Sequence, residues 1–230
     1  MKKSNPDYSF RYSYEKPKPK PAFRMSMTLW LIIINVIFYF IALILGYFYG
    51  DNVMNNIALQ PLAILQYQKL WTIITSMFMH GSVIHLAVNM ISLMFLGSFL
   101  ERIIGKKKFL VSYIICGIVA SIFFVILALL FKSDLSVAAV GASGAIFGIG
   151  GILAVVTPKV PVYIMFIPIA MPMWFGIVLM LAVMWLISAA VGLPIGNTAH
   201  LGGFIAGLAY GFYLRIRYKE RMKRLDRVLR

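Results

Sequence analysis

Residues 141–144 read Gly141-Ala142-Ser143-Gly144 and open an apolar stretch that continues to Pro158. In water a hydroxyl between glycines needs no explanation, but inside a bilayer a polar side chain is a candidate for function. The strong polar partner in this half of the chain is one histidine, His200. Each of the two residues begins an apolar segment, and both segments are expected to enter the membrane from the same side. The interpretation of the chain therefore depends on whether Ser143 and His200 meet.

The composition of the 230-residue chain indicates a membrane protein. Hydrophobic residues make up 61% of the sequence, charged residues make up 13%, and the mean hydropathy is +0.88. A soluble domain carries about 25% charged residues. Apolar runs close to the roughly 20 residues that a spanning helix needs recur along the chain. The sequence therefore predicts an all-α, polytopic membrane protein with one membrane domain, whose surroundings are the lipid bilayer.

Six spans divide the apolar sequence into a six-transmembrane-helix bundle. An even number of spans places both termini on one side of the membrane. The predicted organisation is a basic N-terminal tether at 1–27, a membrane domain at 28–215 and a basic C-terminal tail at 216–230. The six predicted spans are 28–49, 82–100, 109–131, 143–158, 173–191 and 198–214.

The basic residues predict the orientation of the bundle. The formal net charge is +15, and all of the 22 Lys and Arg residues except Lys69 and Lys132 fall on the side of the termini. The positive-inside rule places that side in the cytoplasm. A multi-pass protein of the cell membrane with both termini cytoplasmic is therefore expected. Because the basic residues flank spans and do not form a groove, no nucleic-acid partner is expected.

Depth counts place the two polar residues in one layer. Ser143 lies 15 residues before Pro158, and His200 lies 15 residues before Arg215. At about 1.5 Å per residue, each side chain lies about 22 Å from the inner end of its span. The hydrocarbon core is about 30 Å thick, so both residues are expected in the outer half of the bilayer.

Span two brings two more polar side chains to the same layer. His85 and Asn89 lie about 24 and 18 Å from the inner end at Glu101. Their i, i+4 spacing places them on one face of a helix. The expected layer therefore contains four polar side chains from three different spans.

Glycine spacing indicates which helices approach each other. Gly203 and Gly207 share a face of span six with His200, and Gly144 lies on span four beside Ser143. Small residues at this spacing let helix backbones approach closely in lipid. Such a seam is also typical of helix packing alone, but the histidine on the glycine face favours a site between the two helices.

A serine beside a neutral imidazole is the minimum set for an activated nucleophile. No Asp or Glu lies within any predicted span, so a Ser–His dyad is expected and not a triad. Acyl transfer needs donors for an oxyanion, and His85, Asn89 and the Ser143 N–H are the available groups. His80 precedes span two and is expected to order the connecting loop. The sequence has no His-Glu-x-x-His metal motif.

At this point the chain resembles the rhomboid family of intramembrane serine proteases, in its basic six-span prokaryotic form. The resemblance covers residues 28–215, and it rests on three short motifs that occur in the family's order. They are His80-x4-His85-x3-Asn89, Gly141-x-Ser143-Gly144 and Ala199-His200-x2-Gly203-x3-Gly207.

The resemblance implies a serine endopeptidase that cleaves transmembrane helices of other membrane proteins near their outer ends. It implies that Ser143 is the nucleophile and His200 the general base and acid. His85, Asn89 and the Ser143 amide would form the oxyanion hole. No metal, nucleotide or other cofactor is implied. The supporting residues that it implies are Gly141, Gly144, Phe147, Gly203, Gly207 and His80.

Two positions depart from the family pattern. The loop before span two carries Trp71-Thr72 where Trp-Arg is frequent, so its anchoring is expected to differ. Phe147 stands four residues after the serine where Tyr is frequent, and it can stack on His200 but cannot donate a hydrogen bond.

Two other functions fit parts of the same pattern. A rhomboid-like protein that binds membrane clients without cutting them usually lacks the serine or the histidine, and this chain keeps both. A small transporter would need a polar path through the membrane. Here the polar residues gather in one half, and no internal repeat is evident.

Overall fold

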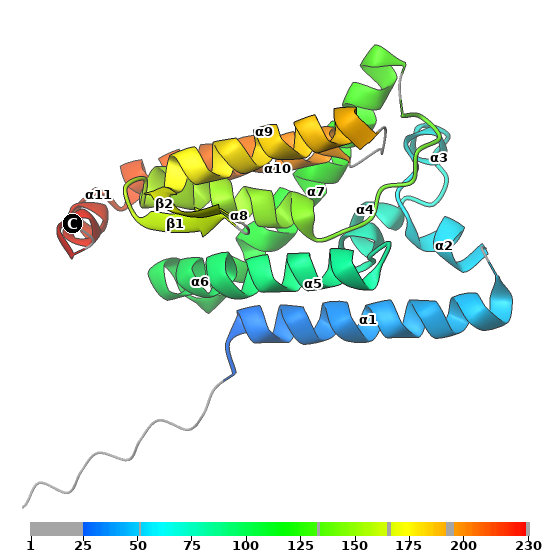
Figure 1. Cartoon of the computed structure of the whole chain (residues 1–230), viewed down its shortest axis with the longest axis horizontal. Helices are drawn as coiled ribbons and strands as arrows, with labels where there is room; N and C mark the ends of the chain where they lie inside the picture. The colour runs from blue at the N-terminus through cyan, green and yellow to red at the C-terminus, as the bar shows by residue number, and fades with distance from the viewer. Residues whose placement is uncertain (1–24, 51, 133, 165–166, 192–195, 229–230) are drawn as a thin grey trace, which may run out of the picture.

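The structure is a computed structural model that describes residues 25–50, 52–132, 134–164, 167–191 and 196–228. The predicted tether falls almost wholly on residues 1–24, which lie outside the described residues. Long helices dominate the remainder, and most of them run along the length of the molecule (Figure 1). The predicted all-α class is confirmed. The long helices are α1 (Met27–Tyr49), α5 (Val83–Ser92) with the π-helical turn η2 (Leu93–Gly97) and α6 (Ser98–Ile104), α7 (Lys106–Phe131), α8 (Ser143–Val156), α9 (Met173–Val191) and α10 (Asn197–Arg217).

Four helices among the described residues are long and apolar enough to cross a membrane: α1, the continuous α5–η2–α6 segment, α7 and α9. The multi-pass membrane fold is thereby supported. Helix α8 has 14 residues, or about 21 Å of rise, against a hydrocarbon core of about 30 Å. Helix α10 is long but carries polar residues at both ends. The count of six spans stays a prediction, although each predicted span coincides with one helical segment.

Helix α8 is the centre of the bundle. It contacts α7, α9 and α10, and every one of its residues except Ser143 and Phe147 is buried. A helix that is apolar on all sides belongs inside a bundle. The two residues that are not fully covered therefore mark the place where α8 faces a cavity.

Glycines bring α8 and α10 into backbone contact. A Cβ atom built on Gly203 would overlap the carbonyl oxygen of Gly144, and one on Gly207 would overlap the carbonyl oxygen of Gly148. The predicted seam is present, and no larger residue fits at these two positions of α10. We call this contact the glycine seam.

Four short helical segments connect α1 to α5: α2 (Asn52–Ile57), α3 (Pro61–Leu65), α4 (Thr72–Thr75) and the 3-10 turn η1 (Ser76–Phe78). Trp71 donates through Nε1 to the Asn56 carbonyl at 2.8 Å, and Lys69 donates through Nζ to the Asn55 carbonyl at 2.7 Å. Thr72 is buried and donates to the Lys69 carbonyl at 2.7 Å. Thr72 therefore stabilises the loop by a hydrogen bond within it, while Lys69 and Trp71 attach the loop to α2.

Two further elements lie at the end of the bundle where α10 finishes, which we call the Arg215 end. The opposite end, where α8 begins, is the Ser143 end. Strands β1 (Pro161–Ile164) and β2 (Ile167–Pro172) form an antiparallel hairpin between α8 and α9. The predicted C-terminal tail forms α11 (Lys219–Val228), which lies at this end of the molecule (Figure 1). Its Met222 is buried in the hydrophobic core.

Glu101 fastens α1 to α6. Its buried carboxylate accepts hydrogen bonds from the Met27 N–H at 2.9 Å, the Thr28 N–H at 2.8 Å and the Thr28 hydroxyl at 2.7 Å. The first N–H groups of a helix have no partner within the helix, and a negative charge there is stabilising. One side chain of α6 thus caps the start of α1.

Replacing Glu101 with alanine is expected to lower the free energy of unfolding by about 1–3 kcal/mol, because it leaves buried donors unsatisfied. The measurement is reversible unfolding in mixed detergent micelles. Glu220→Ala is the matched control, because its carboxylate is 72% exposed and pairs with Lys223 on the surface. Equal losses in the two variants would contradict a capping role for Glu101.

Candidate active site

A sharp turn of the chain positions Ser143 at the start of α8. Gly141 has φ +128°, a conformation that favours glycine, and its N–H donates to the Ser76 carbonyl at 2.9 Å. Helix α8 then begins at Ser143 with no side-chain cap from Ala142. The serine N–H is therefore one of the donors that a helix N-terminus leaves without an intrahelical partner.

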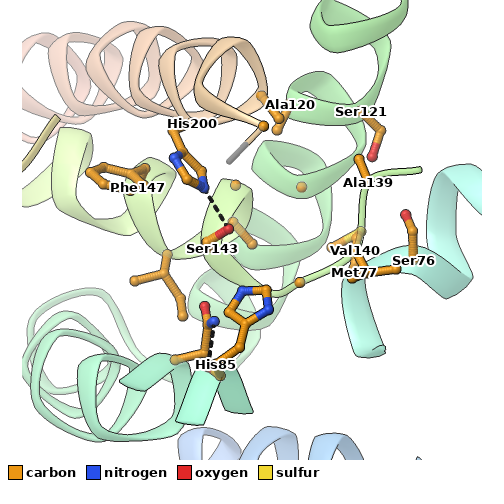
Figure 2. A pocket seen from close by; sticks show the side chains of 18 of the residues that line it. Ser76, Met77, His85, Ala120, Ser121, Ala139, Val140, Ser143, Phe147 and His200 are labelled. Atoms are coloured by element: carbon orange, nitrogen blue, oxygen red, sulfur yellow. Dashed lines mark hydrogen bonds between the residues drawn. The ribbon is translucent and has the colours of Figure 1, made fainter. Parts of the chain in front are cut away.

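Ser143 and His200 meet. The Ser143 Oγ lies 2.7 Å from the His200 Nε2, and Figure 2 shows the two side chains pointing toward each other from α8 and α10. His200 is buried, and its Nδ1 has no hydrogen-bond partner among the described residues. The Phe147 ring lies 4.7 Å from the imidazole at an interplanar angle of 33°. Phe147 thus holds the imidazole by ring contact, as a residue without a hydroxyl must.

His85 lies on the other side of Ser143 from His200 (Figure 2). The backbone N–H of His85 donates to the Ser82 hydroxyl at 3.1 Å, at the start of α5. A Cβ atom on Gly141 would lie 3.0 Å from the Cε1 and Nε2 of His85 and 3.5 Å from the Ser143 Oγ. The absence of a side chain at Gly141 therefore keeps the space between His85 and the serine open.

Asn89 lies one turn after His85 on α5 and is buried. Its Nδ2 donates to the His85 carbonyl at 2.9 Å. An amide nitrogen carries two hydrogens, so the same group can donate a second hydrogen bond into the cavity.

His80 lies beside this group but outside the cavity. Its ring is fully buried and meets the His85 ring edge-on, with the centroids 5.1 Å apart. Burial lowers the pKa of His80 to about 4, and the neighbouring His85 acts in the same direction. At neutral pH His80 is therefore an uncharged packing partner of His85.

A cavity of about 660 Å³ joins these residues. Its wall contains seven of the predicted site residues: Gly141, Ser143, Gly144, Phe147, His85, Asn89 and His200. Gly203 and Gly207 lie on the glycine seam instead. Helix α9 closes another side with the apolar residues Ile177, Met180 and Met184. The wall that α9 contributes is therefore apolar.

The segment before Ser143 was not identified from the sequence. Leu59 and Ala139 exchange two backbone hydrogen bonds, of 3.0 and 2.8 Å, in an isolated antiparallel bridge. Val137, Ala139 and Gly141 line the cavity. The β-branched residues Val137 and Val140 are the signal that could have indicated an extended segment here.

The fold and the site define a polytopic membrane protein with a serine–histidine pair in an apolar cavity. A sequence profile of the Rhomboid domain matches residues 67–217. The chain therefore belongs to the rhomboid family. Within the described residues, no group of three or more His, Cys, Asp and Glu side chains could hold a metal ion.

Three relatives illustrate the similarity. The chain is 33% identical to RHOMBOID-like protein 4 of Arabidopsis thaliana over 174 residues, which cover 71% of this chain and 40% of the relative. It is 29% identical to Rhomboid-like protease 3 of Toxoplasma gondii over 188 residues, 80% of this chain and 67% of the relative. Rhomboid protein 1, mitochondrial, of Saccharomyces cerevisiae is 30% identical over 159 residues, 67% of this chain and 45% of the relative. The chain spans less than half the length of the plant and yeast proteins.

Proposed function

We propose that this protein is a serine endopeptidase that cleaves membrane-protein substrates in or near their transmembrane helices. The observation that carries the proposal is the 2.7 Å contact between the Ser143 Oγ and the His200 Nε2 within a cavity among apolar helices. A hydroxyl hydrogen-bonded to an imidazole is the arrangement that nucleophilic catalysis requires. One relative's name, Rhomboid-like protease 3, supports the same activity.

In the proposed reaction the His200 Nε2 takes the Ser143 hydroxyl proton while the Oγ attacks the carbonyl carbon of the scissile peptide bond. The tetrahedral intermediate collapses when the imidazolium returns the proton to the leaving nitrogen, which breaks the C–N bond and leaves an acyl-serine. Water, deprotonated by the same imidazole, then releases the acyl group. The His200 Nδ1 has no hydrogen-bond partner among the described residues. The ring contact with Phe147 therefore orients the imidazole.

The oxyanion of this intermediate needs preorganised donors. The Ser143 N–H at the start of α8, the second Asn89 amide hydrogen and the His85 ring are the groups that we assign. The N–H also lies at the positive end of the α8 dipole. The three donors come from two helices that converge on one side of the serine.

The surroundings support a substrate that arrives from lipid. Methionine side chains adapt to different partners, and the α9 wall of the cavity presents Met180 and Met184. An unwound segment of a transmembrane helix has apolar side chains, and these suit a wall of methionine side chains.

The proposal includes a position in the membrane. Residues 28–215 would form the membrane domain of a cell-membrane protein, with the Arg215 end in the cytoplasm. The Ser143 end would then lie in the outer half of the bilayer. Support comes from the basic residues of the Arg215 end, which follow the positive-inside rule.

A fluorophosphonate probe tests the nucleophile directly. The wild-type protein in detergent is expected to form one covalent adduct, which mass spectrometry locates on Ser143, and Ser143→Ala is expected to form none. The matched control is Ser121→Ala. Ser121 lines the same cavity, but its hydroxyl donates to the Ile73 carbonyl at 3.2 Å and has no histidine beside it.

Labelling is expected to persist in Ser121→Ala. A wild-type protein that forms no adduct and cleaves no membrane substrate would contradict the proposal. That outcome would favour a rhomboid-like protein that binds clients without cutting them.

A further inference from the structure

Arg215 reaches from the last turn of α10 to the last turn of α8. Its Nε donates to the Val155 carbonyl at 2.7 Å, and its Nη2 donates to the Val156 carbonyl at 3.3 Å. The same Nη2 contacts the Asp226 Oδ1 of α11 at 3.1 Å. One side chain thus joins three helices at the Arg215 end.

The carbonyls that Arg215 binds need an external donor. The last four carbonyls of a helix have no intrahelical partner, and a positive charge at this end complements the helix dipole. Thr157 satisfies the Leu153 carbonyl with its N–H at 2.8 Å and its hydroxyl at 3.0 Å. The Val155 and Val156 carbonyls are left to Arg215.

The glycine seam sets a close separation between these helices, and little side-chain packing fixes their register at that point. At Gly203 and Gly207 the contact is backbone against backbone. Helix register is normally set by side-chain ridges that pack into grooves, and glycines supply no ridge. Directional hydrogen bonds between the two helices therefore add to the side-chain contact of Val155 with Gly211 in resisting sliding along the axis.

Two such bonds lie at opposite ends of the same pair of helices. One joins Ser143 to His200, and the other joins Arg215 to Val155. Arg215 lies 15 residues after His200 on one continuous helix, or about 22 Å away. Because a helix transmits an axial shift along its length, a slip at the Arg215 end changes the distance between the Ser143 Oγ and the His200 Nε2.

We infer that Arg215 is a positioning residue: its hydrogen bonds to the end of α8 hold the axial register in which Ser143 and His200 meet. This inference rests on the proposed function. Asp226 orients the guanidinium from α11, so the C-terminal helix contributes to the same arrangement.

The test is the steady-state kinetics of a single-span reporter substrate in proteoliposomes. Arg215→Ala is expected to lower kcat about 10- to 100-fold, because small displacements of reacting groups are costly. KM is expected to stay unchanged, since no residue that lines the cavity is altered. Arg215→Lys is expected to restore part of kcat, because an ammonium can bind one carbonyl but cannot bind two in a fixed fork.

Arg221→Ala is the matched control. Arg221 donates through Nη2 to the Ile103 carbonyl of α6 at 2.7 Å, so its loss removes a similar bond that does not involve α8. Both variants are expected to lower the melting temperature, but Arg221→Ala should keep the wild-type kcat. A wild-type kcat in Arg215→Ala, or an equal fall of kcat in both variants, would overturn the inference.

A second measurement separates this inference from the proposed function. Spin labels at Lys159→Cys and Phe212→Cys, in a Cys116→Ala background, report the distance between the ends of α8 and α10 without any need for catalysis. Arg215→Ala is expected to broaden or shift that distance distribution, and Arg221→Ala is not. An unchanged distribution in Arg215→Ala would overturn the role of Arg215 in register. A wild-type protein that forms no fluorophosphonate adduct and cleaves no membrane substrate would overturn the proposed function but would leave this distance measurement valid.

Discussion

Replacement of His200 with alanine is expected to slow cleavage of a transmembrane reporter about 10²- to 10⁴-fold, the usual contribution of a positioned acid–base group. The physical reason is the 2.7 Å contact with the Ser143 hydroxyl, since a neutral hydroxyl is a weak nucleophile without a base. Nothing else in the described cavity can replace that base at the same position. The measurement is initial cleavage rate in proteoliposomes.

The double variant Ser143→Ala/His200→Ala makes this prediction sharper. When two residues act as one unit, removing the second has little further effect on the rate once the first is gone. The double variant should therefore be no slower than Ser143→Ala alone. The hydrogen bond itself contributes only about 0.5–1.5 kcal/mol, so unfolding curves should show that both single variants remain folded. Cleavage by His200→Ala at the wild-type rate would contradict the dyad.

Replacement of Gly207 with alanine is expected to abolish most of the activity and to lower stability. The new Cβ would overlap the Gly148 carbonyl oxygen and approach the Gly148 carbonyl carbon at 2.8 Å. Because the obstacle is backbone and not a flexible side chain, α8 and α10 must separate. Overpacking of this kind typically costs about 1–3 kcal/mol. A displacement near 1 Å at the serine can reduce turnover about 10²-fold.

Gly46→Ala is the matched control for this second prediction. Gly46 lies in α1 with no atom within 4 Å of its expected Cβ. Alanine favours helix over glycine by about 1 kcal/mol, so this variant should keep its activity and its stability. The readouts are cleavage rate and unfolding in mixed micelles. If Gly46→Ala and Gly207→Ala behave alike, close contact at the glycine seam does not cause the loss of activity and stability.

Much of the helical framework could be predicted from the sequence, because apolar length is a local property. The predicted bounds of span five, 173–191, coincide with α9. The depth count and the glycine spacing brought Ser143 and His200 together correctly, since both depend only on helix rise and periodicity. The catalytic roles of these residues stay predictions until the reactions described above are measured.

Long-range backbone contacts could not be predicted in the same way. The bridge between Leu59 and Ala139 joins residues far apart in the sequence, and no side-chain pattern specifies that pairing. Arg215 appeared in the sequence only as the charged end of a span. Its contact with Val155 depends on how far α8 extends and on which way α10 is rotated, and neither is encoded locally.

The shortness of α8 has a consequence for biosynthesis. A 14-residue helix is too short to cross the hydrocarbon core alone, so α8 should not settle as an independent segment when it leaves the ribosome. Its final place depends on contact with α10, which is synthesised later. We therefore expect Ser143 and His200 to come together only in a late assembly step, when α8 packs against α10. Incomplete chains in the membrane would then lack the serine–histidine pair.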